Sequence, residues 1–230
     1  FIDNYFPDAD FFVEFERFDR HLDKLRRKNI PVDFVSICSP NYLHDSHIRF
    51  ALKSGADAIC EKPVVLNPWN IDGLIDFEKQ TGGKVHNVLQ LRYHPSIIAL
   101  KEKIEKGPAD KVYDVDLSYI TSRGHWYQFS WKGDVEKSGG VATNIGVHFF
   151  DMLIWIFGSV KFQEVHLSSN GKMSGFIELE RAKYIVQDMA KCTNTGKIYH
   201  LEPIDYVKYG RERRYEAEEQ YQARFGPAQL

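Results

Sequence analysis

The chain has 230 residues and a mass of 26.7 kDa, which is enough for one large domain or two smaller ones. Its 30 lysines and arginines against 32 aspartates and glutamates give a formal net charge of −2, which argues against a general nucleic-acid-binding protein. With 43% hydrophobic and 27% charged residues, the composition excludes a disordered protein. Cys38, Cys60 and Cys192 are too few and too scattered for a disulfide framework or a zinc site, so we expect no metal and a reducing, cytoplasmic location.

The sequence shows neither a membrane span nor a signal peptide. No uninterrupted apolar run reaches the ~18 residues that a span needs, so we expect no membrane partner. The opening residues Phe1–Phe6 contain no Met and lack a basic segment followed by an apolar one. We therefore interpret the chain as one that starts in the middle of a longer sequence.

The first hundred residues alternate short apolar strands with amphipathic helices, a pattern typical of βαβ units and a parallel sheet. Gly55 stands just after one predicted helix, while Asn67 and Pro68 stand where the next helix begins. We predict strands at Val32–Cys38, Ala56–Cys60 and Val85–Leu91, and helices at Asp19–Asn29, Asp45–Lys53, Pro68–Thr81 and Pro95–Lys106.

From Lys111 onward the apolar residues recur every second position, which indicates half-buried antiparallel strands in a second, sheet-rich domain. The segment Arg123–Gly140 shows no periodicity and is predicted to be a long functional loop. An apolar helix is expected at Asn144–Phe157, further strands at Phe162–Leu167 and Phe176–Glu180, and a charged helix at Arg211–Arg224.

Polar residues follow two of the predicted parallel strands. Ser39-Pro40-Asn41 follows one strand and Glu61-Lys62-Pro63 the next, and ligands of open parallel sheets bind beyond these strand ends. Lys62 is either a residue that binds a substrate hydroxyl and takes part in proton transfer or a surface residue in a turn. His44 is either a ligand or a capping or surface histidine.

A second candidate lies at the start of the predicted apolar helix. Asn144 and His148 are four residues apart and therefore share a helix face, and Asp151 follows three residues later. His148 is either a general base oriented by its polar neighbours or a core histidine on an apolar helix.

Three motifs, in this order, resemble those of the Gfo/Idh/MocA oxidoreductases. They are Ser39-Pro40-Asn41 with His44, Glu61-Lys62-Pro63, and Gly146-Val147-His148 with Asp151. Within that family, the segments Leu89–Pro95, Arg123–Tyr127, Ser130–Asp134 and Lys137–Gly140 are similar to the UDP-N-acetylglucosaminuronate 3-dehydrogenases (WlbA/WbpB type) of bacterial surface-polysaccharide (O-antigen) synthesis. The resemblance covers roughly residues 1–182.

The resemblance implies a fold and a reaction. The fold would be an α/β Rossmann-like domain that binds NAD over residues 1–94, with its N-terminal piece missing, followed by an α+β domain over residues 95–230. The open-faced, mainly antiparallel sheet of the second domain would shape the sugar site and build a homotetramer. The reaction would oxidise the C3 hydroxyl of a UDP-N-acetyl-hexosaminuronic acid to a ketone, with NAD as hydride acceptor.

The resemblance also implies roles for individual residues. Lys62 would hydrogen-bond the reacting hydroxyl and His148 would take or relay its proton, as hydride transfer from an alcohol requires. The cofactor would be bound by Ser39, Pro40, Asn41, His44, Glu61, Lys62 and Arg92, and the sugar nucleotide by Tyr127, Trp131, Lys137, Ser138, Asn144 and His148. The local cluster of Arg123, Lys132 and Lys137 suits an anionic sugar nucleotide.

The chain departs from the family pattern in three ways. Asn144 stands where many members have Asp, so it can orient a neighbour but cannot titrate. No segment matches G-x-G-x-x-G. We expect that turn, with the first strand and the acidic ribose-binding residue, to precede Phe1, and we expect the chain alone to bind NAD weakly. The segment after about Tyr184 does not follow the pattern, so no function is carried over to Lys191–Leu230.

Three other functions remain open. The chain could be a different sugar or cyclitol dehydrogenase of the same family, a non-catalytic relative that binds a sugar nucleotide, or a purely structural fragment. Measured turnover on a panel of sugars separates the first from the main prediction, and tight binding without nicotinamide reduction identifies the second.

Overall fold

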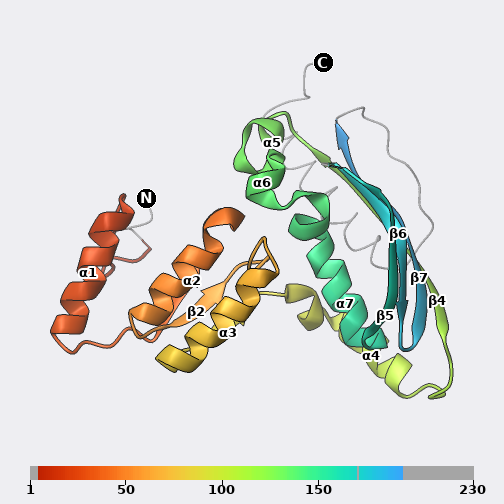
Figure 1. Cartoon of the computed structure of the whole chain (residues 1–230), viewed down its shortest axis with the longest axis horizontal. Coiled ribbons are helices and arrows are strands. Elements are labelled where there is room, and N and C mark those ends of the chain that lie inside the picture. Colours follow the sequence, from red (N-terminus) through yellow and green to blue (C-terminus); the bar gives the residue numbers. More distant parts are fainter. Residues whose placement is uncertain (1–4, 170, 194–230) are drawn as a thin grey trace.

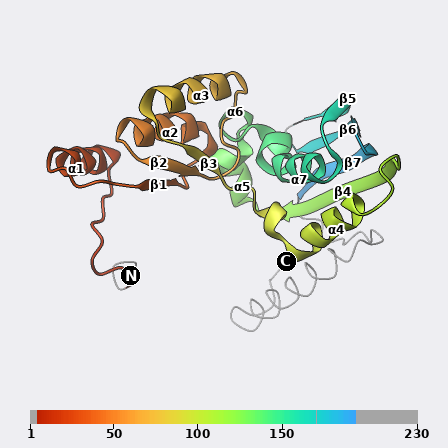
Figure 2. The same cartoon turned by 90° about the horizontal axis from the view of Figure 1, so that it is seen from below.

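The computed structural model describes residues 5–169 and 171–193, which form two lobes (Figure 1). Helices α1 to α3 accompany a parallel sheet in one lobe, and helices α4 and α7 lie along a mixed sheet in the other (Figure 2). The helices are α1 (Phe15–Arg27), α2 (His44–Lys53), α3 (Trp69–Thr81), α4 (Pro95–Glu105), α5 (Trp126–Phe129), α6 (Val135–Ser138) and α7 (Val147–Phe157). The strands are β1 (Phe34–Ile37), β2 (Asp57–Cys60), β3 (Val85–Asn87), β4 (Tyr113–Arg123), β5 (Val160–Ser168), β6 (Lys172–Leu179) and β7 (Ala182–Thr193).

The first lobe contains the parallel sheet that the alternating pattern predicts, in the order β1-β2-β3. Its core is built by α2, α3 and the strands, and Ile48, Leu52 and Cys60 are at most 1% exposed. The third strand ends at Asn87, earlier than predicted, because the chain turns into a 3₁₀ helix at Gln90–Tyr93. Because β1 and β2 pair in parallel, their carboxyl ends lie side by side, as the prediction of a ligand site requires.

The predicted helix signals in this lobe are confirmed. Gly82 follows α3 with a φ of +79°, a left-handed conformation that glycine adopts without a steric penalty. At the other end of α3, Oδ1 of Asn67 accepts the backbone N–H of Trp69 at 3.1 Å. Gly55 has a φ of +85° directly after the C-cap of α2.

The second lobe contains a mixed sheet of order β4-β7-β6-β5. The pairs β5/β6 and β6/β7 are antiparallel, which confirms a mainly antiparallel sheet. The prediction is wrong for β4, which pairs with β7 in parallel. A period of two indicates that a strand has one buried face, but it carries no information about the direction of the neighbouring strand.

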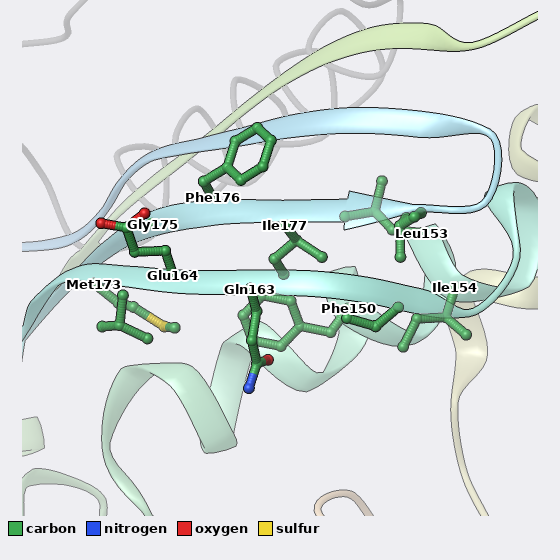
Figure 3. A pocket seen from close by; sticks show the side chains of 12 residues that line it. Phe150, Leu153, Ile154, Gln163, Glu164, Met173, Gly175, Phe176 and Ile177 are labelled. Carbon is green, nitrogen blue, oxygen red and sulfur yellow. The ribbon is translucent and has the colours of Figure 1, made fainter.

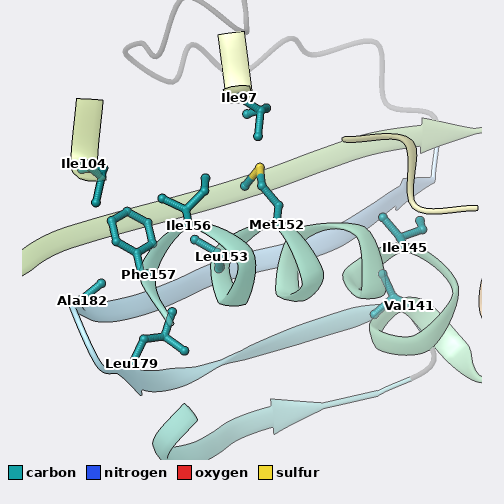
Figure 4. Close-up of a cluster of buried hydrophobic side chains, with 10 residues drawn as sticks. All are labelled: Ile97, Ile104, Val141, Ile145, Met152, Leu153, Ile156, Phe157, Leu179 and Ala182. Atoms are coloured by element: carbon teal, nitrogen blue, oxygen red, sulfur yellow. The ribbon is translucent and has the colours of Figure 1, made fainter. Parts of the chain in front are cut away.

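The core of the second lobe lies between the sheet and helices α4 and α7 (Figure 4). Leu153 of α7 is 3% exposed and Leu179 of β6 is 2% exposed. The ten buried side chains of this cluster are Ile97, Ile104, Val141, Ile145, Met152, Leu153, Ile156, Phe157, Leu179 and Ala182. This packing fixes α7, and with it His148, against the sheet.

The segment Arg123–Gly140 is not the structureless loop that its lack of periodicity predicts. It folds into α5, a 3₁₀ turn at Trp131–Gly133, and α6. Asp134 caps α6 by accepting the N–H of Glu136 at 3.0 Å. Helices of three or four residues complete about one turn and therefore leave no periodic signal.

The predicted helix at Asn144–Phe157 is α-helical only from Val147. Before it, Ala142–Gly146 form a π-helical turn. The helical run Val135–Phe157 passes the length and composition test for a membrane span, yet half of it is buried in the fold. Its buried residues belong to the core of the second lobe. The predicted helix at Arg211–Arg224 lies outside the described residues.

Candidate active site

The site lies where the ends of β1 and β2 meet the second lobe. Nδ2 of the buried Asn41 donates to the backbone oxygen of Ser138 at 2.9 Å. Nζ of Lys62 donates to the backbone oxygen of Asn144 and lies 3.4 Å from Oδ1 of the same residue. The fold thus joins the Glu-Lys-Pro motif to the start of the His148 helix, two segments that sequence analysis treated as separate candidates.

Lys62 is half-buried, and its surroundings change its acidity. Burial lowers the pKa of its ammonium group, because desolvation penalises the charged form. The carboxylate of Glu61 opposes this effect, whereas the positive charges of Lys132 and Arg123 reinforce it. The net result is a pKa below the ordinary value for lysine, so Lys62 gives up its proton more easily than a surface lysine does.

His148 presents a buried ring nitrogen. Within the described part of the chain, its Nδ1 is buried and has no hydrogen-bond partner. Burial and then the positive charge of Lys62 lower the pKa of this imidazole, with Glu61 and Asp151 opposing the shift more weakly. The neutral form is therefore favoured near pH 7, with one ring nitrogen left for a ligand.

Asp151 does not orient His148 through a hydrogen bond, although the spacing suggests it. Its carboxylate forms a two-point ion pair with Arg92, in which Nε of Arg92 lies 2.7 Å from Oδ2 and an Nη group donates to Oδ1. The hydrogen bond to Asp151 raises the pKa of Arg92. The Arg92 side chain, still 40% exposed, is held by Asp151, and its predicted contact with the cofactor remains a prediction.

His44 is neither a surface nor a capping histidine. It is fully buried, with Nδ1 2.6 Å from the backbone oxygen of Pro63 and Nε2 2.9 Å from that of Ser39. His44 therefore ties together the segments that follow β1 and β2. The hydroxyl of Ser39 lies 2.9 Å from Nδ1 of His47, and the predicted cofactor contacts of His44 and Ser39 remain predictions.

The predicted sugar-binding residues differ in their burial and in the contacts that they make. Asn144 contacts Lys62 directly, and its Nδ2 donates to the hydroxyl of the buried Tyr127 at 3.3 Å. Lys137 is exposed and pairs with Asp134 at 3.1 Å, and this contact lowers the pKa of Asp134. The fully buried Ser138 uses its hydroxyl to accept the N–H of Gly140 at 3.1 Å.

Aromatic rings flank the cationic side chains near the site. Nζ of Lys132 lies 5.5 Å from the ring centre of Trp131 and 5.7 Å from that of Trp126. The guanidinium of Arg123 lies 5.8 Å from the ring centre of Tyr127. Cation–π contacts of this kind help to hold the side chains of Lys132 and Arg123, whose positive charges lower the pKa of Lys62.

Sequence reasoning missed the π-helical turn and the hydrogen bonds of Asn41 to the second lobe. Gly139 is a weak signal for the turn, because it has a φ of +78° and a Cβ there would stand 2.7 Å from Cβ of Thr143. A glycine pair before an apolar helix thus indicates a close approach of the backbone. No sequence signal links Asn41 to Ser138, 97 residues away.

A separate apolar groove of about 240 Å³ lies between α7 and strands β5 and β6 (Figure 3). Gln163 and Glu164 are the polar side chains in its wall. The groove contains none of the predicted site residues. Within residues 5–169 and 171–193, no group of three or more His, Cys, Asp and Glu side chains could hold a metal ion.

Two models of one protein family match this chain. Residues 5–88 match the family model described as the oxidoreductase family, NAD-binding Rossmann fold, and residues 101–197 match the C-terminal alpha/beta domain of the same family. The second match extends beyond residue 182, so the family pattern continues further along the chain than the motifs indicate.

Two solved structures of the WlbA (WbpB) dehydrogenase from Thermus thermophilus are similar to this chain. The complex with NAD and alpha-ketoglutarate is 43% identical over 92% of this chain and 65% of that chain, with a TM-score of 0.79. The complex with NAD and UDP-GlcNAcA is 49% identical over 80% of this chain and 60% of that chain, with a TM-score of 0.76. D-glucoside 3-dehydrogenase from Escherichia coli is 27% identical over 68% of this chain and 46% of its own length.

The chain thus spans less than two thirds of the length of these relatives. The two matched domains agree with the two sheets, the parallel one with its polar strand ends and the mixed one against which α7 packs. The chain belongs to the Gfo/Idh/MocA oxidoreductase family.

Proposed function

We propose that the chain acts as an NAD-dependent dehydrogenase that oxidises the C3 hydroxyl of a UDP-N-acetyl-hexosaminuronic acid to a ketone. The observation that supports this most strongly is that Lys62 is bonded to Asn144, at the start of the helix that carries His148, and that its positive charge acts on His148. Both groups have lowered pKa values, and Nδ1 of His148 is buried without a partner in the described part of the chain. Groups of this kind can exchange a proton near neutral pH.

The residues at the strand ends fit the cofactor. Polar groups of Ser39, Glu61 and Lys62 stand at the carboxyl edge of a parallel sheet, where such sheets bind nucleotides. NAD, when bound, supplies the hydride acceptor. In this proposal Lys62 hydrogen-bonds the substrate hydroxyl, and the imidazole of His148 receives its proton. Asn144 orients Lys62 and does not titrate.

The charge around Lys62 supports an anionic substrate. Arg123 and Lys132 both act on Lys62 electrostatically, so positive charge is concentrated at the lobe junction although the whole chain carries −2. A uronate and a diphosphate complement this charge. With the UDP-GlcNAcA complex of the Thermus relative, this favours a nucleotide-sugar substrate, and we propose a role in O-antigen synthesis. The cytoplasmic location and the homotetramer that the family resemblance implies stay part of the proposal.

The proposal is tested by replacing the two residues that handle the proton. Lys62→Ala and His148→Ala should each lower kcat for UDP-GlcNAcA oxidation at saturating NAD by about 10²-fold or more, the usual effect of losing a general acid or base. NADH formation at 340 nm measures this loss. Lys79→Ala and His166→Ala, at exposed positions on α3 and β5, serve as matched controls. Near-normal turnover by either test variant, with normal NAD binding, contradicts the assignment.

The relation to D-glucoside 3-dehydrogenase favours one alternative, a 3-dehydrogenase of another sugar. NADH formation on a panel of UDP-sugars and free sugars decides between these substrates. Turnover of a neutral sugar in preference to UDP-GlcNAcA identifies the alternative. Tight UDP-sugar binding without nicotinamide reduction identifies a non-catalytic relative.

A further inference from the structure

Asn41 stands at the end of β1 in the first lobe, yet its side chain is bonded to the second lobe. The residue is 4% exposed. Its Nδ2 lies 2.9 Å from the backbone oxygen of Ser138 and 3.4 Å from Oδ1 of Asn144. Both donor contacts of this amide therefore cross the junction between the lobes.

Asn144 is the point at which these contacts reach Lys62. Its backbone oxygen accepts from Nζ of Lys62, and its Oδ1 lies 3.4 Å from the same nitrogen. Asn144 belongs to the π-helical turn Ala142–Gly146, and such turns often accompany functional sites. Nζ of Lys62 and Nδ2 of Asn41 are at most about 7 Å apart, since each lies 3.4 Å from one oxygen.

The contacts of Asn144 decide which way its amide faces. The hydroxyl of Tyr127 can donate or accept, so it tolerates either orientation. Lys62 requires an oxygen acceptor while it is charged, but the requirement weakens when Lys62 loses its proton. Nδ2 of Asn41 can only donate, and it therefore holds Oδ1 toward Lys62 in both protonation states. A reversed amide would direct an NH₂ group at the lysine ammonium.

We propose that Asn41 is a positioning residue for Lys62, which acts across the lobe junction by fixing the amide of Asn144. The proposal rests on the proposed function insofar as Lys62 handles the substrate proton. It gives Asn41 a role different from the cofactor contact that the motif implies. The charged groups that shift the pKa of Lys62 are Glu61, Lys132 and Arg123, and Lys62 in turn acts on His148. Asn41 instead fixes the neutral acceptor, Oδ1 of Asn144.

The first experiment follows the titration of Lys62 without cofactor or sugar. Competitive labelling of amines over a range of pH, read by peptide mass spectrometry, reports the pKa of Lys62 in the full chain. Asn41→Asp places a carboxylate within about 7 Å of Nζ and should raise that pKa by at least about half a unit. Asn41→Ala should raise it as well, because a loosened Asn144 lets water reach Lys62.

Asn67→Ala is the matched control, because it removes another asparagine hydrogen bond in the same lobe, to the N–H of Trp69. It should leave the titration of Lys62 unchanged. An equal shift in Asn67→Ala would show a general loss of structure and would overturn the proposal. If the folded Asn41 variants leave the pKa of Lys62 unchanged, the proposal is overturned as well. Circular dichroism verifies folding, and Asn41→Ser provides a second, smaller variant should Asn41→Asp not fold.

The second experiment separates positioning from cofactor binding. With UDP-GlcNAcA and NAD, Asn41→Ala should lower kcat about 10-fold or more and shift the pH profile of kcat, while KM for NAD changes less than about 3-fold. A raised KM for NAD with an unchanged Lys62 titration would make Asn41 a cofactor ligand and overturn the proposal. If no variant or parent turns over this sugar, the proposed function fails, and the labelling result still decides the role of Asn41.

Discussion

His148 is held in surroundings that disfavour its charged form. Burial and the ammonium of Lys62 both lower the pKa of its imidazole below the ordinary value of 6.5. His148 therefore has a higher proton affinity in the unfolded chain than in the folded one. By linkage, the folded state loses stability as the pH falls from about 6.5 through the lower pKa of the folded protein, and it regains this stability as the pH rises.

This dependence yields a prediction for His148→Gln. The free energy of unfolding of the parent should fall relative to that of the variant between about pH 7 and pH 5, because the variant has no imidazole to protonate. Urea unfolding at a series of pH values measures the difference. His166→Gln, an exposed histidine on β5, is the control. A difference between parent and His148→Gln that stays constant with pH would contradict the lowered pKa.

At the scale of single elements, α7 combines a buried face with a partly exposed one. Both Leu153 and its neighbour Ile154 line the apolar groove, but Leu153 belongs to the core cluster and is 3% exposed, whereas Ile154 is 42% exposed. Adjacent residues of similar size therefore experience different surroundings. The helix depends on its buried face for stability, since a helix of eleven residues is marginal in water on its own.

Truncation of these two neighbours tests that difference. Leu153→Ala should lower the free energy of unfolding by about 2–5 kcal/mol through lost burial and the cavity left behind. Ile154→Ala should lower it by no more than about 1 kcal/mol, because much of that side chain already contacts water. Guanidinium unfolding measures both. Equal losses would show that α7 does not pack as the structure describes.

Elements with a strong periodic pattern or a clear end signal could be predicted from sequence. Helix α3, with Asn67 and Gly82 at its ends, and the buried strands β1 and β2 lie close to their predicted positions. The short helices of residues 123–140 could not be predicted, because each is too short to repeat a pattern. Strand β3 ends early because its last predicted residues turn toward the second lobe, which is a tertiary effect.

The candidate site was predictable in its residue types more than in its connections. The motif around Lys62 and the helix carrying His148 were both identified from sequence as places for chemistry. Their contact through Asn144 depends on the approach of residues 82 positions apart. Asp151, the expected partner of His148, instead pairs with Arg92. The 3₁₀ turn that carries Arg92 packs against α7, and sequence spacing within one helix does not report which other element packs on it.

At the scale of the whole molecule, polar contacts connect the segments of the two lobes. Arg92 lies in the 3₁₀ turn between β3 and α4, and Asp151 lies in α7. The Asp151 side chain is 13% exposed and the Arg92 side chain 40% exposed, so the pair is only partly screened by water. It holds the connecting segment against the helix that carries His148.

A double-mutant cycle with Arg92→Met and Asp151→Asn tests this ion pair. We expect a coupling energy of about 1 kcal/mol in urea unfolding, smaller at high salt, since the pair is partly exposed. The exposed pair Arg20 and Glu16 on α1 is the control, with side chains 76% and 69% exposed. Its cycle should give a smaller coupling. A coupling near zero for Arg92 and Asp151 would contradict a role in joining the segments.

The parallel pairing of β4 with β7 has a consequence for the order in which the second lobe folds. Tyr113 pairs with Ala182 and Arg123 with Thr193, so these strands cannot meet until the ribosome has released nearly all of the described chain. The β5/β6 and β6/β7 hairpins, in contrast, pair residues that follow one another closely. Non-local pairing must overcome a larger loop-closure entropy and is slower. We therefore expect the β5-β6-β7 meander to form first and the docking of β4 onto β7 to complete the sheet.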